Sequence, residues 1–286
     1  MSKFLKAKEE EYAQLPEFVF DLILDILVYY GHSKVKLLED TGVLGDFLLM
    51  MLQEKRARNP YLRAKVVEFL LTEGVEVFDL KPTLSSALIQ FYAQVEVTGS
   101  ATGFYDKYSI RYQLATVLMR LWDSSAHAQA LKSLAERGTD VLSPFVRFVN
   151  YLLNDVTYLL DESFSKLQEL HKAEITYNAD NGNADNSLGE RERMMVERQC
   201  TSCMQLANVS TELLERFTRS TPVPFSRPEI VTRLASMLNL VRSLNLYFVG
   251  NCTTGRSSMP RVKGEGCGTV PFPASGVTRE IDASLC

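Results

Sequence analysis

The sequence predicts an all-α fold, and three observations support this. Apolar residues recur at helical spacing from residue 12 to about 249, the predicted helices of 12 to 30 residues are joined by short turns, and this region lacks the alternation typical of strands. Helices of these lengths suit stacked pairs in an elongated armadillo- or HEAT-like solenoid better than a compact bundle. No repeat period accompanies them, so the solenoid is inferred from the element lengths alone.

The first predicted helix begins near residue 12. Its expected buried face consists of apolar residues spaced three or four apart: Leu15, Val19, Leu22, Ile23, Ile26 and Leu27. Asp21 and Asp25 lie one turn apart on another face, where we expect water to solvate them. Gly31 is expected to end this helix, and Gly42 and Gly45 mark further breaks before a short helical segment at 47–52.

The next helices begin at a recognisable start signal. Asn59 has a side chain that can cap a helix, and Pro60 suits the first helical position. The pattern then predicts helices over residues 61–72, 84–97 and 104–122, the last two separated by a turn at 98–100.

The most regular apolar stripe follows Ser143-Pro144 and covers about 23 residues. It consists of Phe145, Phe148, Val149, Leu152, Leu153, Val156, Leu159, Leu160, Phe164 and Leu167. The polar residues Asn150, Asn154, Asp155, Asp161 and Glu162 lie off the stripe. We therefore expect one long helix that spans a whole layer of the fold.

Two breaks divide the remainder of the helical region. Residues 178–189 are rich in Asn, Asp and Gly and predict a flexible loop before a helix from about 190 to 219. The prolines in 221–224 end that helix. Ser226 and Glu229 then have the spacing of a capping box, which predicts a last helix over 230–249.

Composition excludes several classes of function. The net charge is −4 and no basic run is present, so we expect no nucleic acid as partner. No secretory signal heads the chain, and the apolar stretch 18–30 is interrupted by Asp21 and Asp25 and is shorter than a membrane span. The five cysteines follow no extracellular pattern, which favours the reducing cytoplasm or nucleus.

One cysteine pair has the spacing of half a zinc site. Cys200 and Cys203 form a CxxC, but a structural zinc ion needs four ligands and no second CxxC exists. The histidines His32, His127 and His171 are scattered along the chain. Because both cysteines lie in a predicted helix beside apolar residues, we interpret them as core residues.

Other candidate groups also have simpler interpretations. The carboxylate pairs Asp21/Asp25 and Asp161/Glu162 could serve acid–base or metal chemistry, but solvated helix faces explain them better. The aromatic cluster of Phe91, Tyr92, Phe104, Tyr105, Tyr108 and Tyr112 is interpreted as helix packing. No phosphate-binding loop, GxSxG elbow or Cys/His dyad is found. We expect an interaction scaffold with no catalytic residue, no cofactor and no metal ion.

Four ordered blocks nevertheless resemble a known family. They are NPYLRAKVVE (59–68), FYAQVEVTGSATGFYDKYSIRY (91–112), FVRFVNYLLNDVTYLLDESFSKLQELHKAEI (145–175) and TPVPFSRPEIVTRLASMLN (221–239). In this order and at these separations they resemble the core domain of the ubiquitin conjugation factors over about residues 12–245. The third and fourth blocks are the most specific.

The resemblance implies an elongated helical rod that ends, in the family, in a C-terminal U-box. The U-box recruits a ubiquitin-charged conjugating enzyme, so that chains grow on proteins sent to the proteasome. The rod holds an AAA ATPase segregase and ubiquitin or ubiquitylated substrates, which connects the family to ER-associated degradation. A missing catalytic constellation fits this implication, because such ligases act by proximity and orientation.

The expected domain organisation has two parts. Residues 1–249 are a partial core, and residues 250–286 an irregular, disordered tail with six glycines, three prolines and Cys252, Cys267 and Cys286. We attribute the tail to intron read-through, a frame change or an alternative terminus, and expect no U-box and no transferase activity of the chain alone. The alternative function is a non-catalytic adaptor that binds the ATPase or ubiquitylated clients. A third and less favoured possibility is an unrelated HEAT-like scaffold for transport or assembly.

Overall fold

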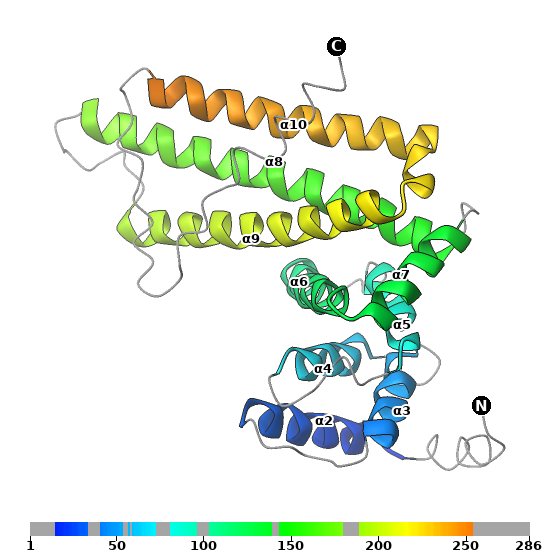
Figure 1. Cartoon of the computed structure of the whole chain (residues 1–286). Coiled ribbons are helices and arrows are strands. Elements are labelled where there is room, and N and C mark those ends of the chain that lie inside the picture. Colours follow the sequence, from blue (N-terminus) through cyan, green and yellow to red (C-terminus); the bar gives the residue numbers. More distant parts are fainter. Residues whose placement is uncertain are drawn as a thin grey trace. The chain divides into compact units, whose positions relative to one another are not determined.

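A computed structural model of the chain describes residues 15–33, 41–53, 57, 59–72, 81–95, 103–138, 143–179 and 189–253. Within these ranges the chain forms nine α-helices, one 3₁₀ turn and no strand, which confirms the all-α prediction (Figure 1). The chain divides into two compact units, Met1–Leu244 and Asn245–Cys286, and every helix except the end of the last belongs to the first unit. The solenoid stays a prediction.

The helices follow one another closely along the chain. They are α2 (Glu17–His32), α3 (Thr41–Leu52), α4 (Pro60–Leu71), α5 (Thr83–Gln94), α6 (Gly103–Leu121), α7 (Ser125–Arg137), α8 (Pro144–Ala179), α9 (Glu190–Ser220), the 3₁₀ turn η4 (Val223–Ser226) and α10 (Pro228–Thr253). The predicted loop at 178–189 lies mostly outside the described residues. The predicted tail, 250–286, overlaps the end of α10, because residues 250–253 are helical, and its remainder lies outside the described residues.

The predicted buried face of α2 is wrong for most of its members, although Leu27 is buried as predicted and Val19 is half-buried. Leu22 is 57% exposed, and Leu15, Ile23 and Ile26 are exposed as well, whereas Leu24, Leu27 and Gly31 are buried. The apolar residues of this helix cover more than one face, so periodicity alone does not decide which face packs. Contact with α4 decides it, since an added Cβ on Gly31 would lie 2.3 Å from Thr72 Oγ1.

The predicted breaks at Gly42 and Gly45 are also wrong, since both glycines lie inside α3. Glycine weakens a helix by roughly 1 kcal/mol relative to alanine. Burial of Leu44, Leu48 and Met51 in the main core offsets this cost. Tertiary packing therefore overrides the local preference.

The start of α4 is confirmed in detail. Asn59 Oδ1 accepts a hydrogen bond from the backbone N–H of Tyr61 at 2.9 Å, and Pro60 occupies the first helical position. The Asn59 side chain also donates to the carboxylate of Glu17, so the same cap connects α4 with the beginning of α2.

Helix α7 is an element that the sequence analysis did not assign. It buries only His127, Leu131 and Ala135, so its apolar pattern is weak. His127 Nδ1 lies 3.0 Å from the hydroxyl of Ser85 on α5, and both residues are buried. A polar contact thus contributes to its position.

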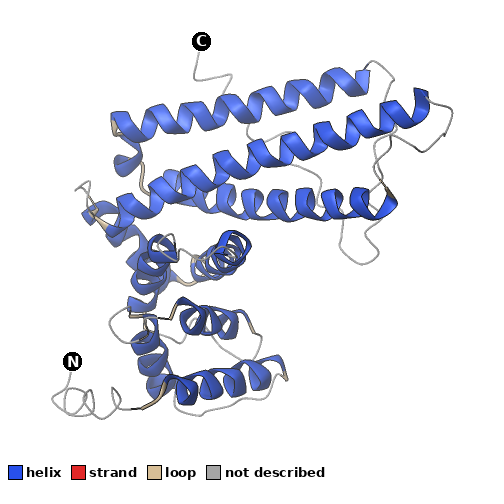
Figure 2. Cartoon of the chain, turned by 180° about the vertical axis from the view of Figure 1, so that it is seen from behind, coloured by secondary structure: helices blue, strands red, loops and turns tan. Residues whose placement is uncertain are grey.

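Helix α8 carries the predicted apolar stripe but is longer than expected, at 36 residues. The stripe from Phe145 to Leu159 is buried, and Leu160, Phe164 and Leu167 are half-buried. Asp155 departs from the prediction because it is only 3% exposed. Along this helix α9 packs more extensively than any other element, and α10 lies on the other side of α8 in both views (Figures 1 and 2).

The predicted capping box before α10 is not formed as expected. Ser226 belongs to η4, where its hydroxyl donates to the carbonyl oxygen of Val223 at 2.8 Å. The following helix begins at Pro228, two positions later. A second proline-led start therefore replaces the predicted serine cap.

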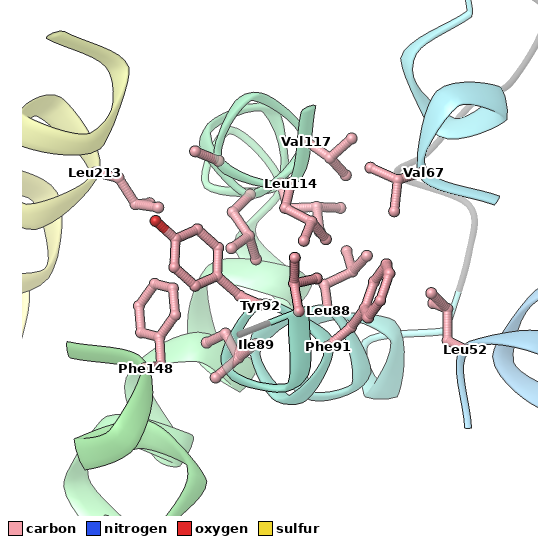
Figure 3. Close-up of a cluster of buried hydrophobic side chains, with 14 of the residues drawn as sticks. Leu52, Val67, Leu88, Ile89, Phe91, Tyr92, Leu114, Val117, Phe148 and Leu213 are labelled. Atoms are coloured by element: carbon pink, nitrogen blue, oxygen red, sulfur yellow. The ribbon is translucent and has the colours of Figure 1, made fainter. Parts of the chain in front are cut away.

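A single large apolar core joins the helices of the first unit. It draws buried side chains from every described helix, from Leu24 of α2 to Met237 of α10. At its centre, residues 88–92 of α5 pack between α6, α8 and α9, with Tyr92 directed toward Phe148 and Leu213 (Figure 3). The rings of Tyr92 and Phe148 meet edge to face, with centroids 5.0 Å apart.

Candidate functional site

An open groove of about 640 Å³ lies between α8 and α10. It is lined by Leu153, Asn154, Thr157, Tyr158 and Asp161 of α8 and by Arg233, Ser236 and Leu240 of α10. These positions are three to four residues apart on each helix, so each helix presents one face to the groove. Apolar and polar side chains alternate in the lining, which is typical of a recognition surface.

Arg233 is the cation of the groove. Its two terminal nitrogens donate to the side-chain oxygens of Asn150 and Asn154, one helical turn apart on α8. Amide oxygens orient a guanidinium group without cancelling its charge. Arg233 forms no ion pair within the described part of the chain.

An aromatic side chain and a carboxylate continue the groove along α8. Tyr158 stacks on Tyr108 of α6 with centroids 5.9 Å apart and ring planes within 3° of parallel. Lys107 covers the Tyr108 ring, with Nζ 4.8 Å from its centroid. Beyond Tyr158 on the same face of α8, Asp161 is exposed to solvent.

A buried charged network lies on the other side of α8. Asp155 accepts hydrogen bonds from Arg111 Nη1 at 2.5 Å and 2.7 Å and from the Tyr92 hydroxyl at 2.8 Å. Arg111 and Tyr92 are fully buried. Burial, followed by the charge of Asp155, raises the pKa of Tyr92 well above its ordinary value. The network joins α5, α6 and α8 at one point and holds a proton on the phenol.

Sequence reasoning missed Arg111, Asp155 and Arg233, although a signal for the first two existed. Arg111 lies three and seven residues before Leu114 and Leu118, which are buried, and so shares their face of α6. Asp155 likewise lies between the buried Leu152 and Leu159. A charged residue in line with a buried stripe implies a buried partner of opposite charge. Nothing comparable in the sequence distinguishes Arg233.

The CxxC motif lies on the α8 side of α9. Cys200 is buried, and its Sγ lies 3.7 Å from the carbonyl oxygen of Ser163 and 3.9 Å from Met204 Sδ. Burial raises the pKa of the Cys200 thiol to about 11, and burial and the charge of Glu162 raise that of Cys203. Both groups are therefore thiols and not thiolates at neutral pH, which makes them poor nucleophiles and metal ligands.

The carboxylates Asp21 and Asp25 have a partner that the sequence did not reveal. Lys65 Nζ of α4 lies 2.6 Å from an oxygen of each, and both carboxylates are about half-exposed. Burial lowers the pKa of Lys65, but hydrogen bonds and charges from the two aspartates outweigh this and leave it raised. The pair acts as a bridge between α2 and α4.

The remaining sequence candidates do not converge. Phe91 and Tyr92 are buried, Tyr108 is half-buried and Tyr112 is 39% exposed, while the side chains of Phe104 and Tyr105 lie outside the described ones. The side chain of Cys252 and the whole of Cys267 and Cys286 likewise lie outside the described part of the chain. Among the described residues, no three His, Cys, Asp or Glu side chains gather closely enough to hold a metal ion. No described helix combines the length and apolar character needed to cross a bilayer.

The described arrangement suits recognition. The groove combines a fixed cation, an aromatic ring and a carboxylate on one accessible surface. The titratable groups with clearly shifted pKa values, in contrast, lie in the core or between helices.

Comparison with known proteins identifies relatives over most of the chain. A family model described as "Ubiquitin elongating factor core" matches residues 2–244. The chain is 35% identical to "Ubiquitin conjugation factor E4" of Schizosaccharomyces pombe over 252 residues, which is 80% of this chain and 25% of that relative. It is 32% identical to "E4 ubiquitin-protein ligase UFD2" of Saccharomyces cerevisiae over 250 residues, 78% of this chain and 26% of the relative.

A plant relative gives the same result. "Probable ubiquitin conjugation factor E4" of Arabidopsis thaliana is 31% identical over 264 residues, which is 80% of this chain and 24% of the relative. The chain thus spans about a quarter of the length of the curated relatives it matches.

Proposed function

This chain belongs to the ubiquitin elongating factor core family, and we propose that it is a scaffold for ubiquitin chain elongation on proteins sent to the proteasome. The observation that carries the proposal is the family match over residues 2–244, which covers all the described helices up to the middle of α10. A rigid helical frame with one continuous core can hold two reactants in fixed orientation, which is how a ligase without a covalent intermediate accelerates transfer.

The partners follow from the same proposal. They are ubiquitin or ubiquitylated substrates and an AAA ATPase segregase, with a conjugating enzyme engaged only where a U-box is part of the protein. The cytoplasm and nucleus are the proposed locations, and ER-associated degradation the proposed process.

A non-catalytic adaptor is the second candidate function. The groove between α8 and α10 favours it, because that surface presents polar groups suited to binding without a pair arranged for proton transfer. In this role the chain binds the ATPase or ubiquitylated clients and competes with complete conjugation factors.

One reconstituted reaction separates the two candidates. Activating enzyme, conjugating enzyme, ubiquitin and a short-chain ubiquitin substrate are combined with the 286-residue chain, with and without the complete fission-yeast relative. We expect no elongation by the chain alone under either function. Shorter products from the complete relative as the chain is added in excess would favour the competing adaptor, whereas longer products would favour the scaffold. Elongation of ubiquitin chains by the 286-residue chain alone would exclude the adaptor function.

A pull-down completes the test. Immobilised chain is incubated with the AAA ATPase and with ubiquitin chains, and retention of either supports a scaffold or adaptor. A folded chain that retains neither and leaves the relative's products unchanged would overturn both functions.

A further inference from the structure

We propose that the groove between α8 and α10 binds an extended segment of a partner protein, with an acidic residue at one position and a basic residue four positions away. The inference rests on the proposed scaffold function and names what one surface of that scaffold recognises. It is carried by four features of the groove: a cation, a carboxylate, the distance between them and the hydroxyl groups that lie along the groove.

Arg233 is prepared to bind a carboxylate. Asn150 and Asn154 use two of its five N–H donors, so three donors remain, and the guanidinium is already held in place. Because both holding groups are neutral, the full positive charge stays at the groove wall. A carboxylate bound here gains charge-assisted hydrogen bonds at little additional cost in side-chain entropy.

Asp161 supplies the opposite charge farther along. It lies eleven residues after Asn150 and seven after Asn154, the two residues that hold Arg233, so the midpoint of that pair is nine residues, or about 13.5 Å, away along the helix axis. Asp161 is exposed and takes part in no ion pair or side-chain hydrogen bond recorded within the described ranges. A lysine or arginine of a ligand can therefore approach it from solvent.

The surface between these charges combines apolar side chains with the hydroxyl groups of Thr157 and Ser236. Leu153, Tyr158 and Leu240 line it, and the stack on Tyr108 holds the Tyr158 ring while 40% of that residue stays exposed. The middle of a ligand thus meets an aromatic ring that loses little conformational freedom on binding.

The hydroxyl groups of the groove favour an extended ligand over a helical one. Thr157 Oγ1 donates to the Leu153 carbonyl oxygen at 2.8 Å, and Ser236 Oγ donates to that of Thr232 at 3.0 Å. Their hydrogens are used within their own helices, so their oxygens face the groove as acceptors. An extended backbone has free N–H groups for such acceptors, whereas the N–H groups of a helix are already paired.

The spacing of the ligand charges follows from chain geometry. An extended peptide spans about 3.3–3.6 Å per residue, so about 13.5 Å corresponds to four residues. The acidic and basic residues are therefore expected at positions i and i+4, with uncharged residues between them.

Fluorescence anisotropy with labelled decapeptides tests the proposal. The probes carry Asp-Leu-Thr-Ser-Lys, the reverse order Lys-Ser-Thr-Leu-Asp, or an adjacent Asp-Lys pair, each flanked by Gly and Ser. We expect the full chain to bind one i, i+4 order saturably and the adjacent pair more weakly. No saturable binding of either order up to about 1 mM, the weak end of specific association, would overturn the proposal.

Charge reversal identifies the site. Arg233→Glu and Asp161→Lys are each expected to weaken the preferred probe by about ten- to hundredfold, the size of a lost charged hydrogen bond. The double variant is expected to bind the probe of opposite charge order in preference. The control reverses two exposed charges of α9, Arg198→Glu with Glu190→Lys, and should leave affinity unchanged.

Two outcomes count against the site. Equal weakening by the control would show general electrostatic attraction, and unchanged binding in the double variant would place the peptide elsewhere. Circular dichroism of each variant shows that it is folded, and the reversed preference of the double variant requires a folded groove. The assay contains no ubiquitin, so its failure is distinct from failure of the scaffold function.

Discussion

At the scale of single residues, the main structural feature is the burial of Arg111 and Asp155. Removing two charges from water costs several kcal/mol each, and their mutual attraction offsets this only when the geometry is good. Here Arg111 Nη1 donates to both carboxylate oxygens of Asp155, and the Tyr92 hydroxyl donates a third hydrogen bond to that carboxylate. The guanidinium carbon of Arg111 also lies 5.0 Å and 5.3 Å from the ring centroids of Tyr92 and Tyr151. Several contacts thus hold the pair, and it is sensitive to loss of either member.

Removing one partner should therefore cost more than removing all three polar groups. We expect Asp155→Leu to lower the free energy of unfolding by about 3–5 kcal/mol, because the buried Arg111 loses the carboxylate that pairs with it. The triple variant Asp155→Leu/Arg111→Met/Tyr92→Phe should recover most of the loss. Urea unfolding followed by circular dichroism measures both, and a triple variant as unstable as the single one would contradict the explanation.

The Cys200 thiol predicts how stability changes in alkaline solution. Its pKa is about 11 in the folded protein, raised by burial from an ordinary value of 9.0. Below pH 9 the Cys200 thiol is protonated in both the folded and the unfolded chain, so its contribution to the free energy of unfolding is complete. As pH rises from about 9 to 11 the unfolded chain loses its proton first, so stability falls.

The measurement compares Cys200→Ala with the natural chain between pH 8 and 11. We expect the free energy of unfolding to fall less steeply in the variant, because only the natural chain carries this titration. Ser202→Ala, an exposed change two residues away, serves as the control. Identical pH profiles for the natural chain and Cys200→Ala would refute the assignment.

At the scale of elements, α2 shows how a helix chooses its buried face. Lys65 of α4 holds Asp21 and Asp25, and the close approach of Gly31 to Thr72 brings the two helices together at the other end. These contacts place Leu24 and Leu27 in the core and leave Phe18 and Tyr29 each 69% exposed. The polar bridge thus contributes to the orientation, although half-exposed ion pairs add little stability.

A matched pair of leucines tests this orientation. Leu24→Ala should lower the free energy of unfolding by about 2–5 kcal/mol, because it opens a cavity where the side chain is fully buried. Leu22→Ala removes the same side-chain atoms at an exposed position two residues away. It should lower the free energy of unfolding by less than about 0.5 kcal/mol. Thermal and urea unfolding compare them, and equal losses would contradict the described face of α2.

At the scale of the whole molecule, the apolar core is continuous from α2 to α10 within the unit Met1–Leu244. The family match ends at the same residue, 244. Trp122, the only tryptophan in the sequence, meets Phe217 of α9 edge to face with centroids 5.1 Å apart, so its fluorescence reports on this core.

Deleting residues 254–286, the part of the predicted tail beyond α10, tests whether that tail contributes to the core. We expect the midpoint of unfolding, followed by Trp122 fluorescence and by circular dichroism, to stay within about 1 °C of that of the full chain, since residues without apolar periodicity add little to a core. The two probes should give coincident transitions. A fall of several degrees would show that the tail stabilises the core.

Much of the fold was predictable because local signals were strong. The Asn59-Pro60 start, the stripe from Phe145 to Leu159 and the proline break after α9 depend on neighbours along the chain, and the structure contains all three. Helix α7 was not predicted, because small and polar residues occupy most of its thirteen positions. The candidate site was missed because Arg233 meets Asn150 and Asn154 from about 80 residues away.

The sequence by itself determined the helical class of this protein, its family and most of its helix boundaries, because these depend on spacing and on ordered motifs. Only the tertiary structure decided which face of α2 is buried, that Gly42 and Gly45 lie inside a helix, and that Arg111 and Asp155 lie in the core. It also decided that a cation, an aromatic ring and a carboxylate share one groove. The physical reason is that burial and charge pairing depend on contacts between residues far apart in the chain, which local periodicity does not contain.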